Sequence, residues 1–350
     1  MEMHTPLLEK TLAQSISPHI TARLIDQTLE THNTKSYFFE SAQPLSEFKA
    51  GSHVNIEFDS AGKSIKRTYT LSSSPKLRDV FSITVKRIEG GLASNWLFNH
   101  LELGDTILVS QPQGQFVLPR PIPGRLLMLS AGSGITPLMS MLRYLTRTNN
   151  HSEITFLHYA QSDSDLIFGD ELKQLAARHA NLSLHFVVER ETTDDTLLTG
   201  RISRENLSQL VPRLQDHEIY LCGPRPFMSA TIKILDDLEF NPSHLHQENF
   251  TADSAALIGS VETPKYSALL SFSNSKLSTQ STPASTILEQ AEAIGLSPSH
   301  GCRMGICRTC LCQKQSGTTV NILTGEESSE GSEYILPCIS VAKTNTVISL

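Results

Sequence analysis

Four cysteines near the C-terminal end constrain the fold of this chain more than any other feature of its sequence. Cys302, Cys307 and Cys310 lie at a Cys-x4-Cys-x2-Cys spacing, and Cys338 follows after 27 intervening residues. A [2Fe–2S] cluster needs four thiolates, two for each iron, with three on one tight loop and the fourth from elsewhere. Zinc sites more often present paired Cys-x2-Cys units, and only one such pair can be drawn here. We expect an iron–sulfur cluster, with a zinc site or inert buried cysteines as alternatives.

The residues around these cysteines resemble those of a known family. Residues 299–310, Ser-His-Gly-Cys-Arg-Met-Gly-Ile-Cys-Arg-Thr-Cys, are similar to the cluster loop of plant-type ferredoxins, and Leu336-Pro337-Cys338 is similar to that family's fourth-ligand segment. The resemblance covers residues 265–350 and implies an α+β domain of the β-grasp type. The metal ligands that it implies are Cys302, Cys307, Cys310 and Cys338.

One cysteine is left over from this set. Cys312 follows Cys310 closely, and we expect it to pack as a small apolar side chain. The alternative is that Cys312 replaces Cys310 as a ligand.

The composition narrows the class of protein further. A length of 350 residues favours two or three domains. The formal net charge of −7 argues against a nucleic acid partner. No run approaches the roughly 18 apolar residues of a membrane span, and the first twenty residues lack the continuous apolar segment of a secretory signal. We therefore expect a cytoplasmic protein without a membrane span, in which clustered cysteines point to metal or redox chemistry rather than disulfides.

The N-terminal third of the chain has the pattern of short β-strands. Gly and Pro turns separate its apolar, β-branched runs, and one short helical stretch at 94–100 interrupts them. The runs lie at 54–58, 80–85 and 106–109. This spacing predicts a small antiparallel β-barrel over residues 20–122, preceded by an N-terminal extension, residues 1–19.

From about residue 124 the pattern changes to alternating strands and helices. The predicted strands are continuous apolar runs, which indicates burial on both faces and hence a parallel α/β sheet. They lie at 125–130, 154–159, 182–188 and 218–222, with helices expected after the first strand and at 169–178. We expect a Rossmann-like nucleotide domain over 123–250, then a linker, 251–264, before the ferredoxin-like domain.

Two short segments of the predicted barrel carry groups that suit a flavin. Arg67-Thr68-Tyr69-Thr70 ends a predicted strand and offers a cation for a phosphate, an aromatic wall and a hydroxyl donor. Gly91, Leu92, Ala93 and Ser94 open the short helix, where we expect Ser94 to cap a helix N-terminus that attracts anions. Each segment alone is weak evidence, but together they predict a flavin site.

This pair of segments resembles the ferredoxin–NADP reductase superfamily. In that superfamily an Arg-x-Tyr-Ser/Thr motif holds the flavin and a Gly-x-x-Ser motif holds the FAD pyrophosphate. Some relatives with fused ferredoxins use FMN, with an Arg near the second motif. Residues 90–95, Gly-Gly-Leu-Ala-Ser-Asn, contain no Arg, so the resemblance implies FAD rather than FMN.

A third pair of segments suits a nicotinamide nucleotide. Gly132 and Gly134 lie between the first parallel strand and a helix, where free backbone N–H groups favour a pyrophosphate. Cys222-Gly223-Pro224 ends a later strand, at the same sheet edge. The pair is similar to the nucleotide domain of the same superfamily, which implies that Thr136 and Cys222 lie near the nicotinamide. Cys222 as a plain buried thiol is the alternative.

Two further expectations concern the ends of this domain. Phe250 is a candidate to cover the flavin ring, or else a core aromatic. NADPH recognition requires cationic groups after the second strand, but residues 159–165 contain Asp163 and Asp165 and neither Arg nor Lys. This favours NADH over NADPH.

The three parts together predict an electron-transfer enzyme. NAD(P)H delivers two electrons as a hydride, whereas the cluster takes one at a time, and a flavin bridges the difference. We expect hydride transfer to FAD near Thr70, Thr136 and Cys222, and then single electrons through the cluster to an acceptor metalloprotein. The domain order resembles the reductases of hybrid cluster proteins most closely and also those of some Rieske oxygenases, which implies a hybrid cluster protein, a Rieske oxygenase or a desaturase as the acceptor. The alternative from another class is a redox-sensing or electron-storing protein without a dedicated partner.

One acidic segment of the ferredoxin-like domain bears on where the acceptor protein binds. Four acids of the ferredoxin-like segment lie close together in the chain: Glu326, Glu327, Glu330 and Glu333. They are either a solvated loop or a docking surface for a basic acceptor.

Overall fold

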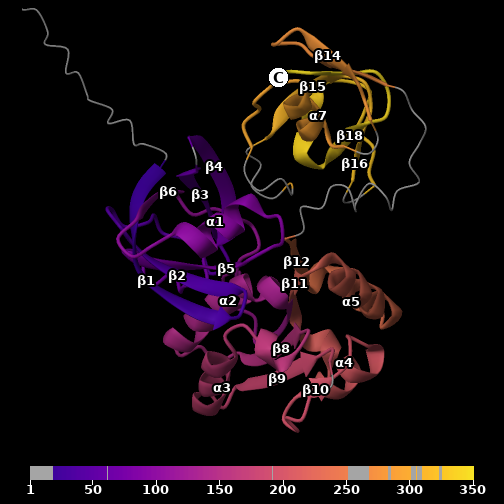
Figure 1. Ribbon diagram of the computed structural model, residues 1–350. Coiled ribbons are helices and arrows are strands. Elements are labelled where there is room, and N and C mark those ends of the chain that lie inside the picture. The colour runs from indigo at the N-terminus through magenta and orange to yellow at the C-terminus, as the bar shows by residue number, and fades with distance from the viewer. Residues whose placement is uncertain are drawn as a thin grey trace, which may run out of the picture.

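The computed structural model describes most of the chain as three folded units, coloured along the sequence in Figure 1. The described residues are 19–350 except 61, 191, 251–267, 283–284, 301–304, 306–309 and 323–324. The predicted N-terminal extension lies outside them apart from His19, with which the first strand begins. The predicted linker also lies outside them.

The first unit is the antiparallel barrel that the strand pattern predicts. Its strand order is β4-β3-β6-β1-β2-β5, and an antiparallel bridge between Leu71 and Ile83 joins the two edges. Phe81, Ile83 and Val85 point into the apolar interior, so the alternating residues of β5 face outward. The elements are β1 (His19–Thr31), β2 (Thr34–Ser41), β3 (His53–Ser60), β4 (Lys63–Thr70), β5 (Val80–Lys86), α1 (Leu92–His100) and β6 (Thr106–Ser110).

The second unit is a parallel sheet of strand order β10-β9-β8-β7-β11-β12. Buried side chains fill both faces of its central strands, which is why these strands read as continuous apolar runs. The order reverses between β7 and β11, so a crevice is expected at their carboxyl ends. The strands are β7 (Arg125–Ala131), β8 (Glu153–Ala160), β9 (Leu182–Val188), β10 (Leu198–Thr199), β11 (Glu218–Gly223) and β12 (Leu245–Asn249).

Helices cover both faces of this sheet. On one face α2 (Ile135–Arg147) and α3 (Gly169–Arg178) pack through Leu138, Leu142 and Leu172. On the other face lie α4 (Arg204–Leu210) and α5 (Arg225–Asp237). Short 3-10 turns occur at Gly132–Gly134, Asp163–Asp165, Leu214–Asp216, Pro242–His244 and, in the third unit, Pro337–Ile339.

The third unit is the α+β domain expected for residues 265–350. A mixed sheet of order β14-β13-β19-β15-β17 packs against α7 (Ile287–Ala293), and a two-stranded sheet pairs β16 with β18. Thr286 and Glu289 form a capping box that begins α7. The strands are β13 (Leu269–Phe272), β14 (Leu277–Gln280), β15 (Cys312–Ser316), β16 (Thr319–Asn321), β17 (Glu333–Ile335), β18 (Ser340–Ala342) and β19 (Thr346–Ile348). Among the described helices, none has the length and apolarity that crossing a membrane requires.

Polar contacts join the barrel to the nucleotide domain. The Ser140 hydroxyl on α2 donates to the Ser73 carbonyl at 2.7 Å. Arg143, one turn further along α2, donates to the Ser72 carbonyl at 2.7 Å and to both carboxylate oxygens of Glu171 at 2.8 and 2.6 Å. Because Ser72 and Ser73 lie two and three residues after Thr70, the last residue of the flavin motif on β4, these bonds fix the motif relative to α2.

Candidate active site

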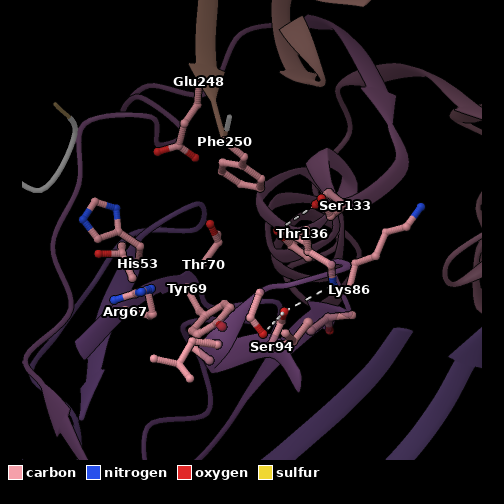
Figure 2. Close-up of a pocket in the computed structure, with 17 residues that line it drawn as sticks. His53, Arg67, Tyr69, Thr70, Lys86, Ser94, Ser133, Thr136, Glu248 and Phe250 are labelled. Carbon is pink, nitrogen blue, oxygen red and sulfur yellow. Dashed lines mark hydrogen bonds between the residues drawn. The ribbon is translucent and has the colours of Figure 1, made fainter. Parts of the chain in front are cut away.

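A cavity of about 340 Å³ lies where the barrel meets the nucleotide domain. It brings together nine of the residues that the sequence analysis singled out, from segments far apart in the chain. Figure 2 shows the labelled side chains among them converging from β4, α1, α2 and the residue after β12. The nine residues are Arg67, Tyr69, Thr70, Gly91, Leu92, Ala93, Ser94, Thr136 and Phe250.

The end of β4 supplies one wall of the cavity. Side chains alternate along a strand, but here Arg67, Tyr69 and Thr70 all reach the cavity because it wraps around the end of the strand. The Tyr69 ring packs against the barrel core, and burial raises the pKa of its phenol, so the ring is a neutral aromatic wall. The Thr70 hydroxyl points into the cavity in Figure 2.

The turn before α1 differs in one respect from the prediction. The expectation that Ser94 caps the helix was wrong: the N-cap is Gly91, and no side chain caps it. Ser94 lies inside the first turn, where its hydroxyl accepts from the Ile88 N–H at 3.2 Å. A Cβ on Gly91 would lie 2.6 Å from this hydroxyl. The glycine therefore permits a tight turn that leaves the first N–H groups of α1 facing the cavity.

Two different structural constraints favour glycine at the two positions after β7, a positive φ at one and a lack of space for a Cβ at the other. Gly132 adopts a φ of +51°, and nothing lies within 4 Å of the position that its Cβ would take. Gly134 is different, because its Cβ would lie 2.3 Å from the Cys222 carbonyl oxygen. The turn thus packs directly on the end of β11, and Thr136, whose hydroxyl donates to the Ser133 carbonyl at 3.2 Å, is brought to the cavity.

The segment Cys222-Gly223-Pro224 lies behind the cavity wall. Cys222 is fully buried, and it is absent from the described residues that line the cavity. Burial raises the pKa of its thiol well above the ordinary value, with a smaller contribution from Glu248. Gly223 packs closely on Phe227 and Ala131. In this arrangement the segment supports the glycine turn, and a direct contact of Cys222 with the nicotinamide stays a prediction.

Sequence reasoning missed three ionisable residues of the cavity, His53, Lys86 and Glu248. Glu248 is 6% exposed, and its Oε2 has no hydrogen-bond partner among the described residues. It comes from β12, opposite Cys222 of β11, and Figure 2 shows its carboxylate turned toward the cavity beside Phe250. A carboxylate two residues before Phe250 was visible in the sequence, but only the pairing of β12 with β11 shows that it is buried.

We expect this carboxylate to make stability depend on pH. Burial raises the pKa of Glu248 to about 8, so the folded protein holds a proton that the unfolded chain releases near its ordinary pKa of 4.5. The stabilisation by that proton is full below the unfolded pKa and is lost as pH rises through the folded pKa. In the flavin-depleted protein, we expect the free energy of unfolding to fall by about 3–5 kcal/mol between about pH 5 and about pH 8.

Denaturant unfolding at a series of pH values measures this loss. Glu248→Gln, which keeps the shape and removes the titration, should abolish most of the dependence. Glu40→Gln, on the exposed surface of the barrel, is the matched control. An equal pH dependence in wild type and Glu248→Gln would contradict the assignment.

The cysteines of the third unit are described in part. Cys310 and Cys338 are both buried, and their sulfurs lie 3.2 Å apart, well beyond the ~2.05 Å of a disulfide bond. This separation suits two thiols that share one metal. Cys302 and Cys307, the other predicted ligands, lie outside the described residues. Cys312 faces another way: it packs in the core of Leu270, Phe272 and Ile348, whereas Cys310 and Cys338 share a different apolar cluster.

The predicted acidic patch is partly neutralised within the domain. Glu327 pairs with Lys343. Glu333 pairs with Lys314 at 3.3 Å, and the buried Lys314 ammonium also donates to three carbonyls, those of Gly317, Ser329 and Gly331. These pairs lower the negative charge that the four glutamates present, so docking of a basic acceptor there stays a prediction.

Comparison with known proteins agrees with this architecture. Residues 21–118 match the family model of the oxidoreductase FAD-binding domain, residues 128–233 that of the oxidoreductase NAD-binding domain, and residues 272–343 that of the 2Fe-2S iron-sulfur cluster binding domain. Over 345 residues the chain is 35% identical to the glycine betaine monooxygenase reductase subunit of Chromohalobacter salexigens, covering 93% of this chain and 94% of the relative. The chain belongs to the ferredoxin–NADP reductase superfamily, in its group with a fused [2Fe–2S] domain. It is an NAD(P)H-dependent oxidoreductase that transfers electrons to a partner protein.

Other known proteins are similar to all or to a large part of the chain. The NADH oxidoreductase HCR of Escherichia coli is 28% identical over 298 residues, which cover 83% of this chain and 85% of the relative. Phthalate dioxygenase reductase has the same fold, with a TM-score of 0.67 at 21% identity over 95% of this chain and 98% of that structure. The FAD/NAD-binding domain of a Vibrio cholerae nitric oxide dioxygenase matches 67% of this chain and 99% of its own, with a TM-score of 0.62 at 27% identity.

The matched domain models imply FAD and a [2Fe–2S] cluster for this chain, and the described residues fit both. The cavity offers an aromatic wall, a guanidinium and the N-terminus of α1, which together suit a flavin with its phosphates. The Glu248 carboxyl group, whose Oε2 has no partner among the described residues, is a further hydrogen-bonding group there. The close approach of Cys310 and Cys338 without a disulfide suits shared iron ligation. The predicted fold class, the enzyme class and the three-domain organisation of FAD, nucleotide and cluster domains are thus confirmed.

Proposed function

We propose that this reductase takes a hydride from NADH and delivers single electrons through its cluster to an oxygenase component. The observation that carries the proposal is the cavity itself, because it places the flavin motif of the barrel against Thr136 and the buried end of β12. FAD, when bound there, supplies the conversion of a two-electron hydride donor into one-electron steps. Residues of the chain bind and orient the flavin and the nucleotide.

Each group of residues then has a distinct role. Arg67 and the start of α1, residues 91–94, bind the phosphates, since a guanidinium and free helix N–H groups both favour anions. Tyr69 and Phe250, from different elements, would pack against the flavin ring, and Thr70 would donate a hydrogen bond to it. On the nucleotide side, the backbone N–H groups of residues 132–134 would bind the pyrophosphate.

Thr136 and Cys222 complete the nicotinamide side of the proposal. Thr136 orients the nicotinamide at the cavity edge, and Cys222 supports the wall behind it through its backbone contact with Gly134. Cys302, Cys307, Cys310 and Cys338 hold the cluster.

The loop after β8 supports NADH as the donor. Asp163 is exposed, and its carboxylate accepts from the Ser164 N–H at 2.7 Å, within the loop that follows the second parallel strand. Asp165 is held by the Ser162 hydroxyl at 2.6 Å and lies 3.6 Å from His32 of the barrel. A free carboxylate at this position accepts from a ribose hydroxyl and repels a 2′-phosphate. We therefore propose that Asp163 discriminates NADH from NADPH, whereas the carboxylate of Asp165 is already hydrogen-bonded within the loop.

We expect NADH to reduce the anaerobic protein and NADPH to do so poorly. In a titration followed by the visible spectrum, NADH should bleach the flavin bands first and then the broad cluster absorbance. Asp163→Asn should narrow the NADH-to-NADPH ratio of kcat/KM by about tenfold, which corresponds to about 1.4 kcal/mol. Asp59→Asn, in the barrel, is the control. Faster bleaching by NADPH in the wild type would overturn the donor assignment, and a cluster that ignores both nucleotides would favour the redox sensor.

The oxygenase partner is supported by the relatives. The chain is 35% identical to a glycine betaine monooxygenase reductase subunit and 28% identical to the reductase named HCR. We therefore place an oxygenase component ahead of a hybrid cluster protein as the acceptor. Purified oxygenase components and a hybrid cluster protein, each mixed with the reductase and NADH, test this order. Electron transfer to the hybrid cluster protein alone would reverse it.

A further inference from the structure

Hydride transfer leaves the flavin pocket with a proton to dispose of. A hydride consists of one proton and two electrons. The cluster accepts electrons only, so each hydride that enters the pocket leaves one proton behind after both electrons have gone. The inner wall of the pocket is buried, with Thr70, Thr84 and Thr136 each at most 6% exposed, so a proton left against that wall needs neighbouring groups able to pass it on.

A row of hydroxyl groups leads away from the pocket on the outer face of the barrel. Thr84 lines the pocket and is 5% exposed. Its hydroxyl oxygen lies 2.8 Å from that of Ser36, its cross-strand partner on β2. Ser36, 2% exposed, donates at 2.6 Å to the carboxylate of Glu30 at the end of β1. Two short hydrogen bonds therefore connect the pocket wall to an ionisable group.

The direction of these bonds allows proton transfer. Ser36 donates its single proton to Glu30, so its oxygen is left to accept from Thr84, and either hydroxyl of that pair satisfies the donor geometry. Thr84 also has a second acceptor, the Ser72 hydroxyl at 2.9 Å. A proton arriving at Thr84 thus has a continuous route to Glu30 in which every hydroxyl gives up one proton and receives another.

Glu30 lies at the domain interface in a setting that suits proton uptake and release. It is half-buried, and burial raises its pKa above the ordinary value. Four groups face it from the neighbouring elements. The Ser36 hydroxyl, the Arg143 guanidinium on α2 and the Phe168 backbone N–H lower that pKa, whereas Glu171 on α3 raises it. Since Glu30 is partly open to solvent, a proton that reaches it can leave the protein.

We propose that Thr84, Ser36 and Glu30 form a relay that carries the proton of each transferred hydride out of the flavin pocket. The balance is complete: the hydride donor loses one hydride, the acceptor protein gains its two electrons one at a time, and the proton passes to Glu30 and then to water. The relay is separate from Glu248, which lies within the pocket on the nucleotide side. The inference rests on the proposed function, because it requires hydride to enter the pocket.

The test measures protons and a carboxyl group rather than turnover. The holoenzyme is reduced with dithionite, freed of excess reductant under anaerobic conditions and mixed with ferricyanide, which takes electrons without protons. A pH-indicating dye in weak buffer then reports proton release by stopped flow. An infrared difference spectrum between the reduced and oxidised holoenzyme reports whether a carboxyl group changes protonation or hydrogen bonding.

The expected results separate the relay from a structural role. Ser36→Ala and Glu30→Gln should each slow proton release about a hundredfold, and Glu30→Gln should remove a carboxyl band from the infrared difference spectrum. Ser36→Thr, which keeps the hydroxyl, should restore release. Glu40→Gln, on the same strand as Ser36 and paired with Arg23 on the surface, is the control for loss of a carboxylate. Wild-type release in both Ser36→Ala and Glu30→Gln would overturn the proposal.

Two further outcomes keep the tests distinct. If Glu248→Gln slows release and Glu30→Gln does not, the proton leaves through the nucleotide side and the relay is wrong. The proton-release test uses dithionite as the reductant and does not depend on NADH. A protein that NADH fails to reduce would therefore contradict the proposed function, but the dye and infrared signals would still test the relay. Glu30→Gln nearly conserves the side-chain volume, so it answers the question even if Ser36→Ala fails to fold.

Discussion

Cys338→Ser should abolish the cluster while leaving the flavin reducible. A [2Fe–2S] cluster holds each iron by two thiolates, and a serine hydroxyl at neutral pH is a poor replacement for one of them. The sulfur of Cys338 lies 3.2 Å from that of Cys310 in a buried apolar cluster, and the substitution leaves that side of the pair without a thiolate. We expect the broad visible absorbance and the bound iron and sulfide to be lost, and electron transfer to the acceptor with them. NADH should still bleach the flavin bands.

Cys312→Ser is the matched control for this variant. It makes the same chemical change two residues from Cys310, but its side chain packs in the separate core of Leu270, Phe272 and Ile348. We expect its spectrum and iron content to match the wild type, with only a modest loss of stability. Loss of the cluster in Cys312→Ser, with retention in a Cys310→Ser variant, would show that Cys312 is the ligand.

Gly134→Ala should disable the nucleotide domain. The added methyl carbon would lie 2.3 Å from the Cys222 carbonyl oxygen and 2.6 Å from the Gly223 Cα. These are backbone atoms, so no side-chain rotation relieves the overlap and the turn after β7 must move away from β11. We expect the free energy of unfolding to fall by about 2–4 kcal/mol. We also expect kcat/KM for NADH to fall about a hundredfold, because the turn positions the nucleotide.

Gly124→Ala gives the comparison for this change. Gly124 lies just before β7, has no positive φ, and has nothing within 4 Å of the position of an added Cβ. We expect this variant to keep wild-type kinetics and stability, or to be slightly stabilised. Thermal unfolding and steady-state kinetics of the two variants decide the matter. Equal behaviour of Gly134→Ala and Gly124→Ala would show that the turn is not held against β11.

The sequence by itself determined the parts of this protein and their chemistry. The spacing of Cys302, Cys307 and Cys310 is a local property, because three ligands on one loop are fixed by chain geometry. The Arg67-Thr68-Tyr69-Thr70 segment and the glycines after β7 are local in the same way. Periodicity likewise predicted the barrel and the parallel sheet, since strand alternation and burial on both faces leave different apolar patterns.

The tertiary structure decided what these parts do to one another. In the sequence, Glu248 has the pattern of an ordinary strand carboxylate. Only the pairing of β12 with β11 buries it beside the cavity. The sequence predicts Ser94 as the helix N-cap, but in the structure the N-cap is Gly91, three residues earlier. The contact of Ser36 with Thr84 and Glu30 joins three strands. Pairing between distant segments sets burial, and burial sets charge and proton affinity, so no local pattern could have revealed these roles.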